Sequence, residues 1–550
     1  DTYNVAVGFE AGTAVTTGIQ NILVGGRAGQ SFTDADDNTA IGDEALTSDT
    51  LGSKSTAVGA NTLATQNFTT ATDTYNVAVG FNAGVLVTTG VRNNFIGGLA
   101  GDATTDADDN IALGYNSLGA NTLGSRSVAV GTDALASQNY TTATNGYNVA
   151  VGYDAGQEIT TGINNTLMGG LAGDALTDAD YNVAIGMQAL TSDTLGSTST
   201  AVGTFALYNQ NFTTATNAYN VAVGYNAGND ITTGVQNTLL GGLAGDALTD
   251  ADYNVAVGIA ALGSDTLGSR TVAIGSGALD SQNFTTATDT YNVAVGFEAG
   301  TAVTTGVQNT LIGGLAGDAL TVGSFNVAVG YAALSSEDSR GRNVAVGYGA
   351  LATQNAGSDA NNVAVGFEAG LSVTTGVRNT VLGAGAGDAI TDGNDNTFLG
   401  YQAGTYQHDL TTGDFCTIVG AFSTTTSTNA QLAAGLGYNL DCAGGFTTLG
   451  QGSTDIRAEH GVATWATVSD ERYKKDITDS TLGLSFINAL KPRTFKYKNK
   501  GDLPSTFSAY EEGSSEVYKF PETQHGFIAQ EVKAAIDADS GAADGFRLWA

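Results

Sequence analysis

Proline is almost absent from this chain. Its 550 residues include only three prolines, Pro492, Pro504 and Pro521, so the first 491 residues contain none. Proline has no backbone N–H, and a long stretch without it suits a hydrogen-bonded ladder that uses every N–H. Glycine is common, at 76 residues, and the usage of both residues changes near residue 465. That change predicts a domain boundary at this point.

Cysteine and long apolar runs are also scarce. Cys416 and Cys442 are too few for a disulfide framework, so the pair is either bridged or, as we expect, buried as thiols. No run of eighteen apolar residues exists, so we expect no membrane insertion by this sequence. Because the chain begins at Asp1 inside a repeat, we expect it to be a piece of a longer protein, and an anchoring or targeting segment could precede it.

Positive charge is rare in most of the sequence. Lys54 is the only lysine before Ser469, and eleven of the 20 lysines and arginines lie between Ser469 and Ala550. The formal net charge of the chain is -34. Such acidity repels nucleic acid and anionic membranes and favours solubility, so we expect no nucleic-acid partner.

An internal repeat dominates the sequence instead. The string YNVAVG recurs with its asparagine at positions 4, 76, 148, 220 and 292, a period of 72 residues. Within each period the equivalent positions follow at steps of 17, 17, 17 and 21 residues, as in Asn4, Asn21, Asn38 and Ser55. The pattern continues to Cys416, less regularly at the end, and gives 24 rungs. Repeats of this kind indicate stacked units, each too small to be stable alone.

Each rung has the same short core, as in Asn4-Val5-Ala6-Val7-Gly8. In a strand, Val5 and Val7 share one face and Ala6 lies on the other. We expect stacking to bury the Val/Ile/Leu face, the glycine to permit a turn, and the asparagines to hydrogen-bond along the stack. The prediction is a mainly β protein built as a parallel β-solenoid. A globular α/β fold is the alternative, but the segments between cores are turn-rich rather than helical.

This ladder resembles the head repeats of trimeric autotransporter adhesins, the YadA-like left-handed β-roll. The resemblance covers residues 1 to about 420 and rests on the recurring core together with an alanine seven residues after its asparagine, as at Ala11, Ala45 and Ala83. It implies a homotrimer of parallel rolls. The rung length of 17 residues exceeds the spacing usual in that family, so we expect larger turns.

The step of 21 residues comes from a longer turn in each period, QNFTTAT in the first. Its aromatic residue lies beside amides and hydroxyls. An exposed ring would suit a weak, multivalent glycan contact, whereas packing of the ring on the neighbouring rung is the simpler interpretation. The residues concerned are Phe68, Tyr140, Phe212 and Phe284.

A pair of aspartates two positions apart precedes a strand in each of four periods. Such a pair on a turn could hold a hard cation such as calcium, the one cofactor we consider. An Asp-rich turn also caps its own backbone without any metal, which is the simpler interpretation. The residues are Asp34 and Asp36, Asp106 and Asp108, Asp178 and Asp180, and Asp250 and Asp252.

The periodicity changes after Ser469. The string LGLSFINALKPRTFKYK predicts a short helix that ends before Pro492 and then a strand, and GFIAQEVKAAI predicts a strand or turn followed by a helix. We therefore expect a β-roll shaft over 1–404, irregular final rungs and a cap over 405–465, and a small α+β domain over 466–550 that is truncated at its C-terminus.

Three strings in the last region, SDERYKKDI, INALKPRTFKYK and HGFIAQEV, closely resemble the endosialidase-type intramolecular chaperone domain at the ends of phage tail fibres and tailspikes. The resemblance implies a domain that trimerises the fibre, assists its folding and cuts itself off at Val468-Ser469. The serine–lysine dyad of that family maps onto Ser469 and Lys474, and His525 supports the site or the trimer interface. A buried lysine can accept the serine proton. Alternatively, Ser469 caps a helix with Glu471 nearby.

These features favour a structural or adhesive homotrimeric fibre, a viral tail or host-attachment fibre, over an enzyme with an external substrate. Its enzymatic activity would be a single self-cleavage. The partners would be two further copies of the chain and a host surface glycan or protein receptor, and the location would be the virion tail or the extracellular surface. A bacterial cell-surface adhesin or extracellular appendage is the alternative. A polysaccharide-degrading tailspike is a third hypothesis, although near-identical repeats are poorly suited to one asymmetric active site.

Overall fold

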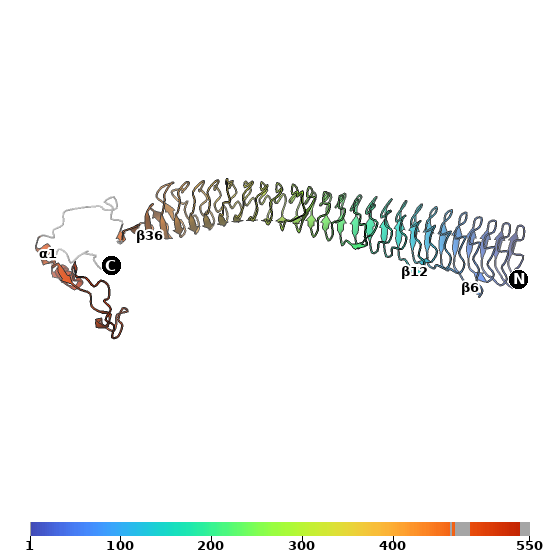
Figure 1. Ribbon diagram of the computed structural model, residues 1–550, viewed down its shortest axis with the longest axis horizontal. Coiled ribbons are helices and arrows are strands. Elements are labelled where there is room, and N and C mark those ends of the chain that lie inside the picture. Colours follow the sequence, from blue (N-terminus) through green and yellow to red (C-terminus); the bar gives the residue numbers. More distant parts are fainter. Residues whose placement is uncertain (1, 463–464, 468–483, 539–550) are drawn as a thin grey trace. The chain divides into compact units, whose positions relative to one another are not determined.

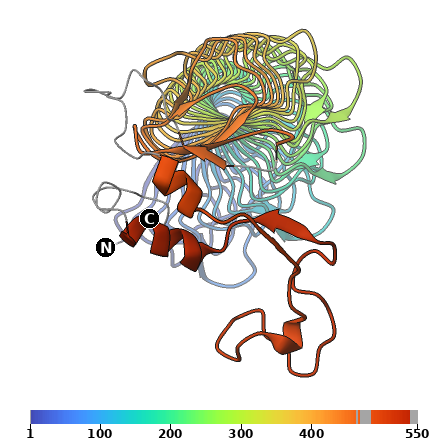
Figure 2. The same cartoon turned by 90° about the vertical axis from the view of Figure 1, so that its left-hand side faces the viewer.

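The computed structural model describes residues 2–462, 465–467 and 484–538. It divides into two units, Asp1–Thr467 and Val468–Ala550, and each is described by itself. The first unit is a parallel β-solenoid in which successive turns of the chain stack along one axis (Figure 1). Viewed along the stack, these turns superpose on one another (Figure 2). The predicted mainly β, parallel β-solenoid is therefore confirmed, and the globular α/β alternative is wrong.

One long sheet of 28 strands runs along the solenoid. Each rung contributes one short strand. In the first half these are β1 (Val5–Val7), β2 (Ile22–Val24), β3 (Thr39–Ile41), β5 (Thr56–Val58), β7 (Val77–Val79), β8 (Asn94–Ile96), β9 (Ile111–Leu113), β11 (Val128–Val130), β13 (Val149–Val151), β14 (Thr166–Met168), β15 (Val183–Ile185), β17 (Thr200–Val202) and β19 (Val221–Val223).

The second half continues in the same way. Its strands are β20 (Thr238–Leu240), β21 (Val255–Val257), β23 (Val272–Ile274), β25 (Val293–Val295), β26 (Thr310–Ile312), β27 (Val327–Val329), β28 (Val344–Val346), β29 (Val363–Val365), β30 (Thr380–Leu382), β31 (Thr397–Leu399), β32 (Thr417–Val419), β34 (Ala434–Tyr438) and β36 (Phe446–Gln451).

Equivalent residues of adjacent rungs pair directly and in parallel. Ala78 of β7 lies opposite Phe95 of β8, which lies opposite Ala112 of β9. This register persists through β36, two strands beyond the 24 rungs that the repeat predicts. The sequence pattern is lost there because Ala433 and Phe446 stand where most earlier rungs have asparagine, serine or threonine. The solenoid consequently has about 26 turns.

Asparagine side chains form a second ladder inside the solenoid, as the sequence predicts. The Nδ2 of Asn237 donates to the Ala251 carbonyl at 2.8 Å, and its Oδ1 accepts the backbone N–H of Asn254 at 3.0 Å. Asn237 and Asn254 are fully buried. Each amide thus satisfies both a turn carbonyl of the next rung and the start of the next strand.

The predicted orientation of the strand faces is wrong. The middle residue of each strand points into the core, as Ala40, Ala57 and Ala78 show, whereas the flanking Ile41 and Ile96 are exposed. The rungs are narrow, so most rungs have a small side chain at this middle position. Larger apolar groups reach the core from the turns instead, as Phe32 and Leu46 do.

Core packing also accounts for the 72-residue period. The second rung of each period has a large middle residue, such as Phe95, and glycine at the turn position that faces it. A Cβ at Gly101 would lie 2.6 Å from the Phe95 ring. The third and fourth rungs combine a small middle residue with leucine at that turn position, as Leu118 and Leu135 show. Large and small residues therefore alternate to fill one continuous core.

The glycine that ends each core is required by the stacking distance. Gly114 has φ +147, and a Cβ there would lie 2.2 Å from the carbonyl oxygen of Gly131 in the next rung. The same close approach recurs along the solenoid. Glycine is therefore needed both for the turn and for contact between rungs.

Short strand pairs, all of them parallel, lie beside the main sheet, four of them at the long turns and one near the end of the solenoid. These pairs are β4 (Gly52–Ser53) with β6 (Thr72–Asp73), β10 (Gly124–Ser125) with β12 (Thr144–Asn145), β16 (Gly196–Ser197) with β18 (Thr216–Asn217), β22 (Gly268–Ser269) with β24 (Thr288–Asp289), and β33 (Thr424–Thr425) with β35 (Asp441–Cys442).

The end of the solenoid changes its pairing. β36 pairs antiparallel with β37 (Ile456–Glu459), which pairs antiparallel with β38 (Trp465–Thr467). The antiparallel pairs occupy the open edge of the sheet, which would otherwise present unpaired backbone groups. Cys416 and Cys442 lie nearby as free, buried thiols, and burial raises the pKa of Cys442 to about 12.

The second unit is small and has both helices and strands. It contains α1 (Leu484–Ala489), β39 (Arg493–Phe495), the 3-10 helix η2 (Lys500–Asp502), β40 (Gln524–Gly526) and α2 (Ala529–Ala538). β39 and β40 pair antiparallel, and a small core joins Phe486 of α1 to Ala535 and Ile536 of α2. The predicted helix before Pro492, the following strand and the C-terminal helix are confirmed.

Candidate functional site

The C-terminal unit contains the predicted self-cleavage residues. Val468, Ser469, Glu471 and Lys474 lie outside the described residues, so the dyad stays a prediction. His525 lies in β40 opposite Thr494 of β39, with its Nδ1 3.4 Å from the Thr494 Oγ1. It is exposed to solvent. The structure therefore presents this imidazole on a strand surface where another group can approach it.

An ion pair links the β39–β40 strand pair to α2. Arg493 of β39 donates from Nε and one terminal nitrogen to the two carboxylate oxygens of Glu531, at 2.8 and 2.7 Å. The hydrogen bonds and charge of Arg493 lower the pKa of Glu531. A bidentate arginine–carboxylate pair restricts orientation, so it helps to hold β39, the strand paired with that of His525, against the helix.

The C-terminal unit leaves much apolar surface uncovered. Its described core contains only Phe486, Ala535 and Ile536, with Leu490 and Val532 packed against them. Several large apolar side chains are exposed instead: Leu484, Ile487, Phe507, Phe520 and Phe527. Among the residues that the structure describes, so small a core contributes little stability, and the exposed side chains form surface that a partner can cover.

The solenoid has a second uncovered apolar surface along its strands. The third residue of each strand faces outward, and at least a third of its surface is exposed in many rungs. We name these residues the strand stripe. Its exposed members are Val7, Ile41, Ile96, Leu113, Met168, Ile185, Val223, Leu240, Ile274, Ile312, Leu382, Leu399 and Leu436.

Aromatic side chains extend the strand stripe. They occupy the residue after the core glycine in many rungs, and Tyr331, Tyr348 and Phe367 stack on one another with ring centroids 5.5 and 5.3 Å apart. All three rings are about half exposed. A continuous apolar surface of this length is unusual for a surface that faces only water.

The aromatic residues of the long turns are not exposed. Phe68, Tyr140, Phe212 and Phe284 are each at most 6% accessible, so a glycan contact through exposed rings is wrong at these positions. The Tyr140 hydroxyl donates to the Gly162 carbonyl of a neighbouring rung at 2.8 Å. The rings pack inward because the four additional residues of the long turn enlarge the interior at that rung.

A buried polar cluster lies beneath each long turn, and sequence reasoning missed it. The Asp193 carboxylate is fully buried and accepts hydrogen bonds from Gln210 Nε2 at 2.6 Å, from the Gly196 N–H at 2.9 Å and from the Phe212 N–H at 3.3 Å. Gln210 accepts in turn from the Asn220 Nδ2 at 2.9 Å. Burial raises the pKa of Asp193, although these hydrogen bonds oppose the rise.

The cluster repeats with the period of the long turns. Asp49, Asp265 and Glu337 occupy the same position in other periods, and burial raises the pKa of each. In the second period the residue is Asn121, which accepts the Gly124 N–H at 3.0 Å. The sequence signal was present, because each of these residues lies 17 positions before the glutamine of its long turn.

The aspartate pairs link adjacent rungs. Asp250 accepts the Thr233 hydroxyl at 2.6 Å, and Asp252 accepts the Val235 N–H at 2.7 Å. The equivalent pairs make the same contacts in the three earlier periods. Among the described residues, no group of three or more His, Cys, Asp or Glu side chains is placed to hold a metal ion. Calcium at these pairs therefore stays a prediction, with two carboxylates as its protein ligands.

Within the part of the chain that the structure describes, no helix has the length and apolar character needed to cross a membrane. No curated protein and no solved structure shows a significant match to the chain. Residues 469–540 match the model of the family described as chaperone of endosialidase. The chain thus combines a long parallel β-solenoid with a small C-terminal domain similar to the chaperone of endosialidase.

Proposed function

We propose that this chain forms a homotrimeric fibre, a tail or host-attachment fibre of a virus, whose solenoid is the durable shaft and whose C-terminal domain is an intramolecular chaperone. The observation that carries the proposal is the strand stripe, the outward apolar face of the long sheet. The match of residues 469–540 to the chaperone of endosialidase supports it, because such a domain acts on a fibre that must assemble.

The strand stripe suits copies of the same chain better than an unrelated partner. It follows the sheet for about 26 rungs, a length on the order of 120 Å at the spacing between strands. A second copy offers the same spacing, the same period and the same apolar character. Closed rotational symmetry lets each copy cover the stripe of its neighbours without leaving an open edge.

The C-terminal domain has a role that fits the difficulty of this assembly. Parallel rolls of repeated sequence can pair in several registers, and pairing out of register would still bury apolar residues. A small domain that trimerises first, through exposed residues such as Ile487 and Phe527, would bring the three chains together with equal register. The small core among its described residues supports this role.

Self-cleavage would then separate the chaperone from the shaft. The Ser469 hydroxyl would give its proton to the Lys474 amine and attack the Val468 carbonyl. The Val468-Ser469 C–N bond would then break, the protonated Lys474 would return the proton to the leaving Ser469 nitrogen, and an ester between the Val468 carbonyl and the Ser469 hydroxyl oxygen would form. Water would hydrolyse this ester to the Val468 carboxylate and the free Ser469 hydroxyl. A lysine can act as a base at neutral pH when burial lowers its pKa. The product would be a shaft that ends at Val468 and a released domain.

Trimer formation can be tested with charges in the strand stripe. The variant Val223→Glu/Leu240→Glu/Val257→Glu places three carboxylates in three successive rungs, and we expect it to be a monomer by light scattering. The control Thr69→Glu/Thr141→Glu/Thr213→Glu adds the same charge to exposed residues of the long turns and should remain a trimer. A monomeric parent chain, or a trimeric stripe variant, would contradict the proposal.

Self-cleavage can be tested by intact mass. The parent chain should yield a product that begins at Ser469, and Ser469→Ala and Lys474→Ala should each give an uncut chain. Lys475→Ala is the matched control, because it removes the adjacent lysine and should still be cleaved. Cleavage in both dyad variants would overturn the assignment.

A further inference from the structure

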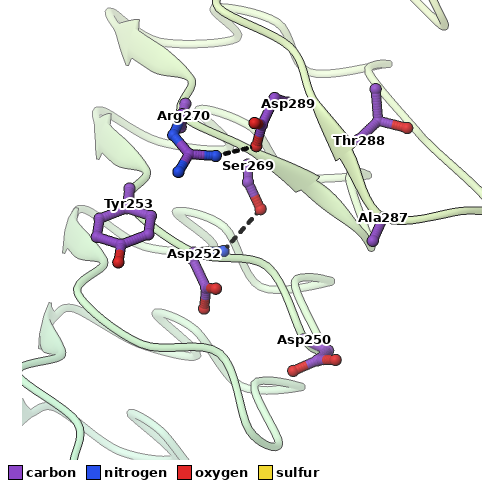
Figure 3. Close-up of a pocket in the computed structure, with 8 residues that line it drawn as sticks. All are labelled: Asp250, Asp252, Tyr253, Ser269, Arg270, Ala287, Thr288 and Asp289. Carbon is purple, nitrogen blue, oxygen red and sulfur yellow. Dashed lines mark hydrogen bonds and ion pairs between the residues drawn. The ribbon is translucent and has the colours of Figure 1, made fainter.

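A cleft opens beside the fourth long turn, between two adjacent rungs and the strand β24. Its volume is about 420 Å³, and Asp250, Asp252, Tyr253, Ser269, Arg270, Ala287, Thr288 and Asp289 line it. Figure 3 shows Tyr253, Arg270, Ser269, Asp252 and Asp289 of β24 grouped together, with Ala287, Thr288 and Asp250 apart from them. The cleft is separate from the strand stripe, because turn residues and not the sheet face line it.

Part of the polar lining is already used to build the cleft. Asp252 accepts the Val235 N–H and donates its own N–H to Ser269 Oγ at 2.9 Å, and Asp250 accepts the Thr233 hydroxyl. The contacts with Thr233 and Val235 each use one carboxylate oxygen. Asp250 and Asp252 therefore each keep a second carboxylate oxygen that can accept a hydrogen bond from a ligand.

The remaining lining supplies a donor and a ring. Arg270 pairs directly with Asp289 (Figure 3). It also lies between two exposed tyrosines, 5.1 Å from the Tyr253 ring centroid and 6.0 Å from that of Tyr291. The Tyr253 side chain is nearly half exposed. The guanidinium is thus held in place by a carboxylate and two rings while it still faces solvent.

The three earlier periods have equivalent positions. They keep a backbone hydrogen bond of the cleft but carry different side chains at its surface. The hydrogen bond between the aspartate N–H and the serine hydroxyl recurs at 2.9 Å in Asp36–Ser53, Asp108–Ser125 and Asp180–Ser197. The residue at the position of Arg270 varies, and it is Lys54, Arg126 or Thr198 in the earlier periods. The residue at the position of Tyr253 also varies, and it is Asp37, Asp109 or Tyr181.

We propose that the cleft lined by Asp250, Asp252, Tyr253 and Arg270 binds uncharged sugar residues of a polysaccharide. Carboxylates accept hydrogen bonds from sugar hydroxyls, arginine donates to sugar oxygens, and a tyrosine ring contacts the apolar face of a sugar. An acidic saccharide would be repelled by the carboxylates and by the net charge of -34. An ammonium group would be repelled by the guanidinium of Arg270.

The three related clefts would bind the same polymer more weakly. Successive clefts are one period apart, four rungs, which is on the order of 19 Å at the spacing between strands. A long polysaccharide could therefore occupy several clefts of one fibre, and weak sites would add up to useful avidity. This inference rests on the proposed adhesive function and assigns its ligand class to a particular site.

The test is binding of the purified full chain to an array of neutral gluco-, manno- and galacto-oligosaccharides, with sialylated, uronic-acid and glucosamine oligosaccharides on the same array. Titration calorimetry of the best neutral oligosaccharide follows. We expect selective binding of a neutral oligosaccharide, with one tightest site per chain. No binding, or binding of only acidic or amino-bearing oligosaccharides, would overturn the proposal.

The chain itself supplies variants that should fold. Arg270→Thr and Tyr253→Asp reproduce residues that occupy the equivalent positions in other periods, at the same positive φ. Loss of one charge-assisted hydrogen bond should weaken the tightest site about tenfold. Val322→Ala, at an exposed turn residue outside the cleft, is the matched control. Unchanged affinity in both cleft variants would also overturn the proposal.

Light scattering of the same samples separates this inference from the fibre proposal. If the chain is a trimer and binds no neutral sugar, only the proposal of sugar binding at the cleft is contradicted. A monomer that binds a neutral sugar through Arg270 and Tyr253 contradicts only the trimer.

Discussion

The solenoid and the C-terminal unit differ in how much of their apolar surface a single chain can bury. In the solenoid, one core cluster runs from Leu23 to Cys442 with its members almost completely inaccessible. In the described part of the C-terminal unit, three residues are buried and larger ones such as Phe520 are exposed. The difference indicates that a single chain buries one continuous core in the shaft, whereas the described part of the C-terminal unit leaves large apolar side chains uncovered.

A substitution that creates a cavity in the solenoid core should have the largest effect and so tests most strongly whether the shaft is stabilised by its own core. Leu239 is fully buried at the middle of β20, and Leu239→Ala should lower the free energy of unfolding by about 2–5 kcal/mol. Val322→Ala, at a half-exposed residue of a turn, should cost less than about 0.5 kcal/mol. Denaturant unfolding followed by circular dichroism measures both. Equal losses would mean that the core assignment is wrong.

Dilution should sharpen the comparison between the two units. If the C-terminal unit depends on partner chains, its amides in β39, β40 and α2 should lose protection from hydrogen exchange as the chain concentration falls. The asparagine-ladder amides, such as that of Asn254, should keep theirs. We expect at least a tenfold difference in exchange rate between the regions. Protection of both regions at every concentration would remove the distinction.

Acid should act on the solenoid through its buried carboxylates. Burial raises the pKa of Asp193 above its unfolded value, so the folded chain binds that proton more tightly. The stabilisation that comes from this bound proton is complete below the pKa that Asp193 has in the unfolded chain. It is lost as the pH rises through the pKa of Asp193 in the folded chain. Asp193→Asn should remove this dependence and change stability by about 1 kcal/mol, a common size for one substitution.

The second period provides the matched reverse experiment. Asn121→Asp adds a fifth buried acid at the same position, and it should increase the loss of stability between acidic and neutral pH. Thermal unfolding across that pH range measures both variants against the parent. If each variant changed the unfolding temperature by the same amount at every pH, these carboxylates would not titrate in the folded chain.

Surface ion pairs should matter least. Arg378 and Asp395 lie in adjacent rungs with two hydrogen bonds of 2.6 and 2.7 Å, and both side chains reach solvent. Because water and salt screen such pairs, Arg378→Ala should cost less than about 1 kcal/mol. The effect should also shrink in high salt. A larger loss would mean that contacts at the solenoid surface rival those of its core.

Much of the fold could be predicted because the same sequence pattern recurs in nearly every rung. The spacing of the asparagines predicts the strands and their register, and absence of proline agrees with an unbroken ladder. The candidate sites were harder to predict. Nothing local to Phe68 or Tyr140 says whether the ring lies inside or outside, because that depends on the room created by four additional residues in the turn. Asp193 is an ordinary turn residue until Gln210, 17 positions later, is placed over it.

The sequence by itself determined the periodic elements: the parallel strands, the asparagine ladder, the glycines that permit close stacking, and the change to a chaperone-like domain near Ser469. Only the tertiary structure decided which face of each strand is the core. Alternation defines two faces but does not orient them, and the narrow interior of the roll admits Ala256 while it leaves Val255 and Val257 partly exposed. The outward apolar stripe, and the cleft at Arg270, follow from that choice.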